Sequence, residues 1–181
     1  MSSGRVAPLG LGWPNLISVT RILLAPVLVV LVVSEGRLAA YVAAVVFVLG
    51  AATDRLDGYL ARRYASATRT GAWLDPLADK LFVLAPVVAL TAVDRFPLWA
   101  TIVFVVREVA VSILRAWLGV HGRSMPATPL GQWKTALQMV AILLYLLPLA
   151  ESLDPVKLGV LIAAVALTVW SGLDYLVRVR A

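Results

Sequence analysis

Residues 54–79 read DRLDGYLARRYASATRTGAWLDPLAD, and they place four aspartates in a chain that is 61% hydrophobic. Asp54 and Asp57 are three positions apart and Asp75 and Asp79 four apart, so each pair falls on one face of a helix. Two such faces brought together form a cluster of four carboxylates, whose repulsion in apolar surroundings requires a positive charge. Oxygen-rich clusters of this kind are typical ligands of Mg²⁺ or Mn²⁺. The stretch therefore predicts two helices that hold divalent ions between them.

Two other interpretations of these aspartates stay open. They could cap helix ends at a membrane interface, or they could relay protons or Na⁺ in a cation-coupled transporter. Neither role requires the glycines and the arginine in the same register, at Gly58, Gly71 and Arg62. A guanidinium binds phosphate oxygens through a rigid fork of donors, so the combined pattern favours phosphate chemistry.

The composition of the chain is that of a membrane protein. Only 14% of the 181 residues are charged, and the mean hydropathy is +0.92. Apolar stretches long enough to cross a bilayer, for which about 20 helical residues suffice, occur at 16–33, 38–60, 72–92, 98–118, 135–149 (starting nearer 130) and 156–177. We therefore expect an all-α integral membrane protein, a single domain over 1–181 that forms a bundle of six transmembrane helices. A short interfacial segment should precede the first helix, with Trp13 at the level of the lipid headgroups.

The distribution of basic residues orients this bundle. Of the sixteen Lys and Arg residues, only Arg37, Arg95 and Lys157 fall on the predicted outer side. Cytoplasmic loops carry the excess of positive charge, so the aspartates should face the cytoplasm of a multi-pass cell-membrane protein. The same distribution argues that the net charge of +6 serves orientation rather than nucleic-acid binding. No cleavage site follows the N-terminal residues, so we expect the first span to be retained.

The whole pattern, Asp-x2-Asp-Gly-x2-Ala-Arg-x8-Gly-x3-Asp-x3-Asp, resembles the signature of the CDP-alcohol phosphotransferases. These membrane enzymes displace CMP from a CDP-linked lipid or alcohol. All eight specified positions match this sequence. The resemblance implies two divalent ions, Mg²⁺ or Mn²⁺, and a homodimer among membrane lipids.

The resemblance also assigns roles within residues 54–79. It implies that Asp54, Asp57 and Asp75 hold one ion, that Asp54, Asp75 and Asp79 hold the second, and that Asp79 accepts the proton of the incoming hydroxyl. The residues that it assigns to CDP-diacylglycerol are Gly58, Arg62 and Thr68.

A second group of charges lies in the fourth apolar stretch, where Arg107, Glu108 and Arg115 interrupt the hydrophobic residues. Ionisable residues at such a depth are functional by default and seek partners within the bundle. Arg-Glu-x6-Arg followed by Lys-Thr-x2-Gln is similar to family members that use glycerol 3-phosphate. The resemblance implies that Arg107, Arg115 and Lys134 bind sn-glycerol 3-phosphate, which would attack CDP-diacylglycerol to give phosphatidylglycerophosphate and CMP.

Alternatives to this acceptor site remain open. Glu108 could form an internal salt bridge with one arginine, which would still leave an arginine uncompensated. The acceptor could instead be phosphatidylglycerol, as in cardiolipin synthases of the CDP-alcohol type, or an inositol phosphate. The family often has Gly-Lys where this chain has Gly131-Gln132, which leaves one phosphate contact open. Lys80 could be a surface charge or a cation that balances the aspartates, and His121 receives no role.

Two local predictions rest on proline and glycine. Pro76 is tolerated in a first helical turn but disruptive deeper in, so the third helix should begin close to Asp75. Segment 120–134 contains Gly122, Pro126, Pro129 and Gly131, so it should be a connecting loop.

Overall fold

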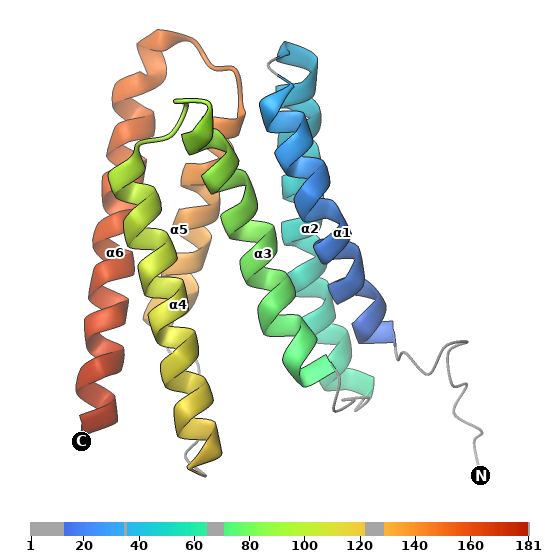
Figure 1. Cartoon of the computed structure of the whole chain (residues 1–181), viewed down its shortest axis with the longest axis vertical. Coiled ribbons are helices and arrows are strands. Elements are labelled where there is room, and N and C mark those ends of the chain that lie inside the picture. The colour runs from blue at the N-terminus through green and yellow to red at the C-terminus, as the bar shows by residue number, and fades with distance from the viewer. Residues whose placement is uncertain (1–12, 35, 65–70, 122–128, 181) are drawn as a thin grey trace. The chain divides into compact units, whose positions relative to one another are not determined.

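The computed structural model describes the backbone of residues 13–34, 36–64, 71–121 and 129–180, and the side chains of 18–34, 36–53, 76–121 and 130–177. Within these ranges the chain forms six α-helices and one 3-10 helix and no strand, which confirms the all-helical prediction (Figure 1). The elements are α1 (Trp13–Val33), α2 (Arg37–Tyr64), α3 (Gly71–Ala92), α4 (Leu98–Val120), α5 (Pro129–Leu146), η1 (Glu151–Leu153) and α6 (Asp154–Arg180). Each predicted apolar stretch coincides with one α-helix. The expected interfacial segment before α1 lies largely outside the described residues.

Two predicted boundaries are wrong, and prolines explain both. Helix α3 begins at Gly71, about one turn before Asp75, with Pro76 inside it. The fixed φ of proline is compatible with a helix, so Pro76 removes one backbone hydrogen bond without ending α3. Helix α5 begins at Pro129, which agrees with the expected start of the fifth stretch near 130, but the end of the predicted loop, up to Lys134, is helical. Proline suits the first helical position because the amide hydrogen that it lacks would have no partner there.

The structure divides into two compact units, Met1–Pro86 and Val87–Ala181, and each is described by itself. The boundary falls inside α3 at Pro86, which lacks the amide hydrogen that would bond to Phe82. The expectation of a single domain stays a prediction.

In the first unit α1 packs along α2. The buried residues of both helices recur at intervals of three and four, as one helical face requires. They are Ser18, Arg21, Ala25, Leu28 and Val32 on α1, and Ala40, Ala43, Ala44, Phe47 and Gly50 on α2. The small residues on α2 let the two backbones approach closely.

Gly50 lies where α2 meets α3, and we expect Gly50→Ala to destabilise this contact. The Cβ of an alanine there would stand 2.3 Å from Cζ of Phe82. That ring is 2% exposed and stacks on Phe47 at a centroid distance of 5.5 Å, so it has little room to move. Overpacking of this kind costs about 1–3 kcal/mol of unfolding free energy, which thermal unfolding in detergent would measure.

Gly159→Ala is the matched control, because Gly159 lies inside α6 and an added Cβ there meets nothing within 4 Å. Alanine favours a helix over glycine by up to about 1 kcal/mol, so this variant should unfold at the same temperature or higher. Equal melting temperatures for the two variants would contradict the close contact between Gly50 and Phe82.

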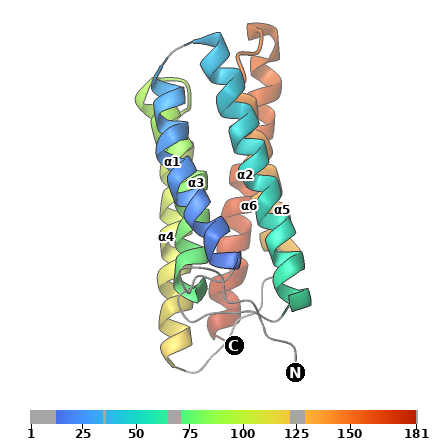
Figure 2. The ribbon, with the colours of Figure 1, turned by 90° about the vertical axis from the view of Figure 1, so that its right-hand side faces the viewer.

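In the second unit α4 and α5 both pack against α6 (Figures 1 and 2). The buried faces of α5 and α6 are each apolar towards one end and polar towards the other. The apolar part comprises Ala100 and Phe104 on α4, Ala141, Ile142 and Leu146 on α5, and Leu161 and Ala164 on α6; the polar part includes Lys134 and Gln138 on α5 and Thr168 and Ser171 on α6. Because α5 runs opposite to α6, the polar stretches of the two helices meet at the same end. This end of the unit holds the charged residues of α4.

A tight turn closes α3 at the apolar end of this unit. Asp94 has a φ of 56°, the left-handed conformation that ends many helices. The amide of Arg95 donates to the carbonyl of Leu90 at 2.8 Å, and that of Asp94 to Thr91 at 3.1 Å, as in a Schellman cap. The guanidinium of Arg95 then donates to the carbonyls of Tyr145 and Leu146 at the end of α5. The turn thus satisfies backbone groups of two helices.

Among the described residues one helical run, Glu151–Val177, is long and apolar enough to cross a membrane. Ser18–Val33 and Arg37–Thr53 are shorter apolar helical runs. A crossing by all six helices therefore stays a prediction.

Candidate functional site

The four predicted metal ligands lie on two helices, as their spacing required. Asp54 and Asp57 fall on α2, and Asp75 and Asp79 fall on α3, so each pair shares a helical register. Most of the corresponding side chains lie outside the described residues: Asp54, Asp57, Gly58, Arg62 and Asp75, together with the whole of Thr68. Among the side chains that are described, no group of three acidic, histidine or cysteine residues gathers. The roles of these residues stay predictions.

Asp79 is the one predicted metal ligand whose side chain is described. Its Oδ1 lies 2.5 Å from Nη1 of Arg21 on α1. The Arg21 side chain is 5% exposed and that of Asp79 is 46% exposed, so a buried guanidinium holds a carboxylate that stays accessible. This contact fixes the orientation of the Asp79 carboxylate. The sequence offered a weak signal for Arg21, a charged residue within the first apolar stretch, but no partner.

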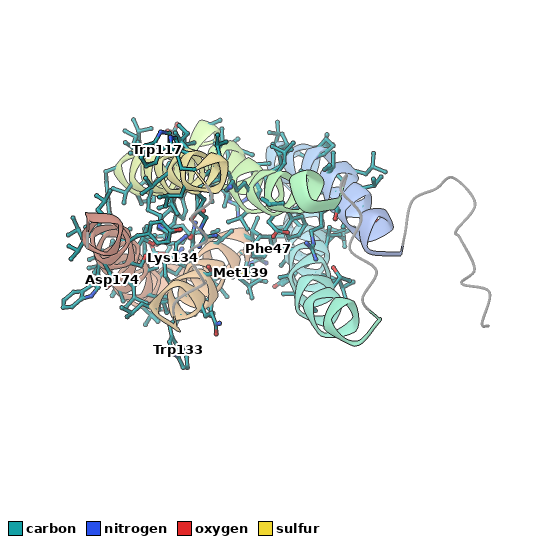
Figure 3. All side chains as sticks on the ribbon, turned by 90° about the horizontal axis from the view of Figure 1, so that it is seen from below. Phe47, Trp117, Trp133, Lys134, Met139 and Asp174 are labelled. Carbon is teal, nitrogen blue, oxygen red and sulfur yellow. The ribbon has the colours of Figure 1, made fainter. Side chains whose placement is uncertain are left out.

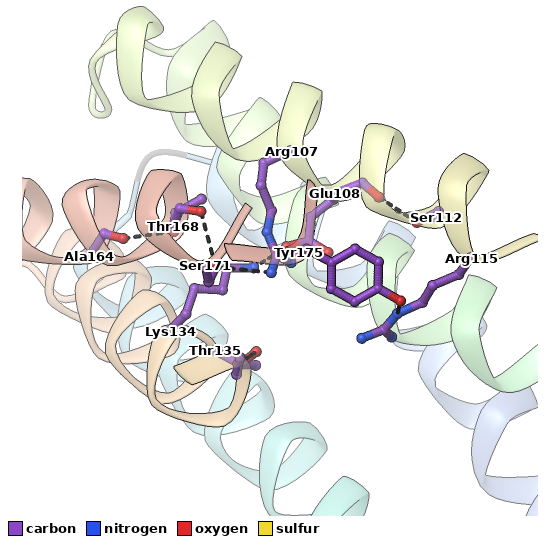
Figure 4. Close-up of polar contacts among 11 residues, drawn as sticks. Arg107, Glu108, Ser112, Arg115, Lys134, Thr135, Ala164, Thr168, Ser171 and Tyr175 are labelled. Atoms are coloured by element: carbon purple, nitrogen blue, oxygen red, sulfur yellow. Dashed lines mark hydrogen bonds and ion pairs between the residues drawn. The ribbon is translucent and has the colours of Figure 1, made fainter. Parts of the chain in front are cut away.

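In the second unit the predicted phosphate-binding residues share one cluster, which Figure 4 shows. Glu108 on α4 accepts hydrogen bonds through Oε1 from Nη1 of Arg107 at 3.2 Å and from Nζ of Lys134 on α5. The internal salt bridge that the sequence left open as an alternative therefore exists, and it joins Glu108 to the lysine as well as to an arginine. Glu108 thus pairs with two cations, Arg107 and Lys134.

Helix α6 supplies the remaining partners of this cluster. Nη2 of Arg107 donates to Oγ of Ser171 at 3.0 Å, and that hydroxyl donates in turn to the carbonyl of Thr168 at 3.0 Å. Nε of Arg115 donates to the hydroxyl of Tyr175 at 3.1 Å, and the guanidinium lies 5.3 Å from the centre of the same ring. These residues of α6 carry no charge, so they orient the arginines without neutralising them.

The two arginines converge on α6. Arg107 and Arg115 are eight residues apart, about 12 Å along a helix, whereas Ser171 and Tyr175 are four apart, about 6 Å. Because both arginines bond to these partners, their side chains lean towards each other across the α4–α6 contact (Figure 4). The sequence carried no signal that singled out Ser171 or Tyr175 as their partners.

Lys134 and Gln138 bring the face of α5 into the cluster. Lys134 is 2% exposed and points into the space among α4, α5 and α6, whereas the neighbouring Trp133 points outward and is 70% exposed (Figure 3). Gln138 follows one turn later on the same face and is 1% exposed. Its Nε2 and the Nε of Arg107 are buried and have no hydrogen-bond partner in the described part of the chain. The cluster therefore retains two unused donors.

Comparison with known proteins identifies a family over most of the chain. Residues 11–170 match the sequence model of the family described as CDP-alcohol phosphatidyltransferase. A Pseudomonas fluorescens protein named CDP-diacylglycerol–glycerol-3-phosphate 3-phosphatidyltransferase is 42% identical over 171 residues, covering 90% of this chain and 87% of the relative.

Two further relatives cover similar shares. A Mycobacterium tuberculosis protein named probable phosphatidylglycerophosphate synthase is 38% identical, over 91% of this chain and 79% of its own length. An Escherichia coli protein with the same name as the Pseudomonas relative is 34% identical, over 93% of this chain and 94% of its own length.

Proposed function

Because this chain belongs to the CDP-alcohol phosphatidyltransferase family, we propose that it transfers the phosphatidyl group of CDP-diacylglycerol to sn-glycerol 3-phosphate. The products are phosphatidylglycerophosphate and CMP. The names of its relatives support the two substrates. The observation that carries the choice of acceptor is the cationic cluster of α4, α5 and α6.

The charge of this cluster matches a phosphomonoester. Arg107, Arg115 and Lys134 are cationic and Glu108 is anionic, which leaves these four residues at +2. A phosphomonoester carries about −1.5 to −2 at neutral pH, because its second pKa is near 6. A phosphodiester such as phosphatidylglycerol carries only one negative charge. The cluster therefore suits glycerol 3-phosphate better than phosphatidylglycerol.

The unused donors of the cluster point to the same class of ligand. Nε of Arg107 and Nε2 of Gln138 are buried without described partners. A buried donor without a partner costs about 1–3 kcal/mol, so a ligand that supplies acceptor oxygens would recover that free energy. The phosphate and hydroxyl oxygens of glycerol 3-phosphate are such acceptors.

Asp79 is proposed to take the proton of the acceptor's 1-hydroxyl. The glycerol oxygen then bonds to the phosphorus that carries diacylglycerol, and the bond from that phosphorus to the CMP oxygen breaks. Arg21 holds the Asp79 carboxylate in place, and a proton acceptor must be positioned within reach of the proton that it takes. Gly58, Arg62 and Thr68 would bind the nucleotide end of CDP-diacylglycerol, a role that rests on the family signature alone.

Asp54, Asp57, Asp75 and Asp79 would hold the divalent ions, Mg²⁺ or Mn²⁺, and their carboxylate oxygens are the hard ligands that these ions prefer. When bound, such ions would neutralise charge on the diphosphate.

The chain is proposed to span the cell membrane six times, with the active site facing the cytoplasm. Large apolar side chains on every α-helix are exposed, including Leu23 at 63%, Val30 at 64% and Ile113 at 64%. Soluble proteins rarely expose apolar faces of this extent, whereas lipid covers them without cost. The homodimer is proposed from the family resemblance alone.

A direct assay tests the function. Purified protein incubated with Mg²⁺, CDP-diacylglycerol and glycerol 3-phosphate should release CMP and form phosphatidylglycerophosphate, and the rate with phosphatidylglycerol as acceptor should be at least about 100-fold lower. The reason is the extra charge-assisted bonds of a phosphomonoester, each worth about 1.5–3 kcal/mol. Faster CMP release with phosphatidylglycerol would replace this proposal with cardiolipin synthesis. If no acceptor led to the release of CMP, the proposed transferase activity would be refuted.

A further inference from the structure

Glu108 joins cations that come from two different helices. Its Oε1 accepts from Arg107 on α4 and from Lys134 on α5, and its side chain is 16% exposed. We propose that Glu108 is a positioning residue that keeps Lys134 charged and directed into the acceptor site. This inference rests on the function proposed above.

The burial of Lys134 carries the first step. At 2% exposure, the Lys134 side chain has almost no contact with water. Burying an ammonium group costs on the order of several kcal/mol of free energy unless an anion compensates its charge. Glu108 is the carboxylate that the structure places against it. Without that carboxylate, Lys134 would face the other cations of the cluster, and it would either lose its proton or turn away. In both cases the acceptor phosphate would lose a cation.

The partners of the arginines carry the second step. Arg107 also bonds to Ser171, and Arg115 bonds to Tyr175 on α6. Both arginines therefore keep a described partner when Glu108 is neutralised. The described hydrogen bond of the Lys134 ammonium is the one to Glu108, so a loss of Glu108 should act mainly through Lys134.

The sign of the charge on Glu108 excludes a direct role in holding phosphate. A carboxylate and a phosphate repel each other at short distance, so Glu108 would weaken binding if it touched the ligand. Its proposed contribution is therefore indirect, through the lysine that it orients. This distinguishes a positioning residue from a ligand-binding one.

A double-mutant cycle with Glu108→Gln and Lys134→Met tests the proposal. We expect each single variant to raise KM for glycerol 3-phosphate by at least about tenfold, the loss of one charge-assisted bond. KM for CDP-diacylglycerol and kcat should stay within about twofold, because the lost interaction is one of ground-state acceptor binding. The double variant should match Lys134→Met within about twofold, since residues that act through one another are not additive.

Two outcomes would overturn this role of Glu108. One is a double variant in which the fold rise in KM for glycerol 3-phosphate equals the product of the rises in the two single variants. The other is a KM for glycerol 3-phosphate that is lower in Glu108→Gln than in the unchanged protein. If Glu108→Gln does not fold, Lys134→Met and the double variant still decide, because the double variant leaves no unpaired charge at this pair. A further tenfold rise in KM from Lys134→Met to the double variant, on the order of one bond, would then contradict the proposal.

Glu151→Gln is the matched control. It removes the same charge from the same unit, but Glu151 is exposed in η1 and makes no described contact with the cluster. Its kinetic constants should equal those of the unchanged protein. A failure of the proposed function is recognised separately, because the unchanged protein would then not use glycerol 3-phosphate at all.

Discussion

Asp79→Asn should lower the rate of CMP release by about 10²–10⁴-fold, the usual contribution of a positioned general base. Asparagine keeps the shape of the side chain but cannot take a proton, and it gives the Arg21 guanidinium only a neutral acceptor. Steady-state release of CMP at saturating CDP-diacylglycerol and glycerol 3-phosphate would measure the effect. Thermal unfolding in the same detergent would establish that the variant is folded.

Asp94→Asn is the control for this substitution. Asp94 lies in the turn after α3 with a φ of 56°, a conformation that asparagine adopts readily. Activity and stability should be unchanged. Normal CMP release by Asp79→Asn, at any concentration of Mg²⁺, would exclude Asp79 as the proton acceptor and as a required metal ligand.

Arg107→Lys should lower kcat/KM for glycerol 3-phosphate more than any other charge-conserving substitution in the cluster. A lysine cannot donate to Glu108, to Ser171 and to a ligand in the fixed fork that a guanidinium provides. Loss of one or two charge-assisted bonds corresponds to about a 10- to 10³-fold fall in kcat/KM for glycerol 3-phosphate. Varying each substrate in turn would show that KM for CDP-diacylglycerol is almost unchanged.

Arg115→Lys provides the comparison for this prediction. Arg115 is exposed, and its described contacts are both with Tyr175, so its replacement should cost less than that of Arg107. If either substitution raised KM for CDP-diacylglycerol alone, the arginine would be assigned to the binding of CDP-diacylglycerol instead. The assignment of the acceptor site would then be wrong.

The sequence alone determined the helices and the kind of chemistry. Six apolar stretches coincide with α1 to α6 because helix formation depends on residues three and four apart, a spacing that can be read directly from the chain. The whole pattern of aspartates, glycines, alanine and arginine in 54–79 resembled a family signature, and the comparison later showed that family. The start of α3 was predicted too late, close to Asp75, because Pro76 marks a local preference that the rest of the helix can override. The predicted loop extended past Pro129, which is the first residue of α5.

Only the tertiary structure decided which charged residues meet. Arg21 and Asp79 are 58 positions apart, Glu108 and Lys134 are 26 apart, and Arg107 and Ser171 are 64 apart. Such contacts depend on the axial register and the facing sides of separate helices, which packing sets and local periodicity does not encode. From the sequence, the family resemblance predicted that Arg107, Arg115 and Lys134 bind a phosphate. The packing of α4 and α5 on α6 added the carboxylate, the hydroxyls and the unused donors around them.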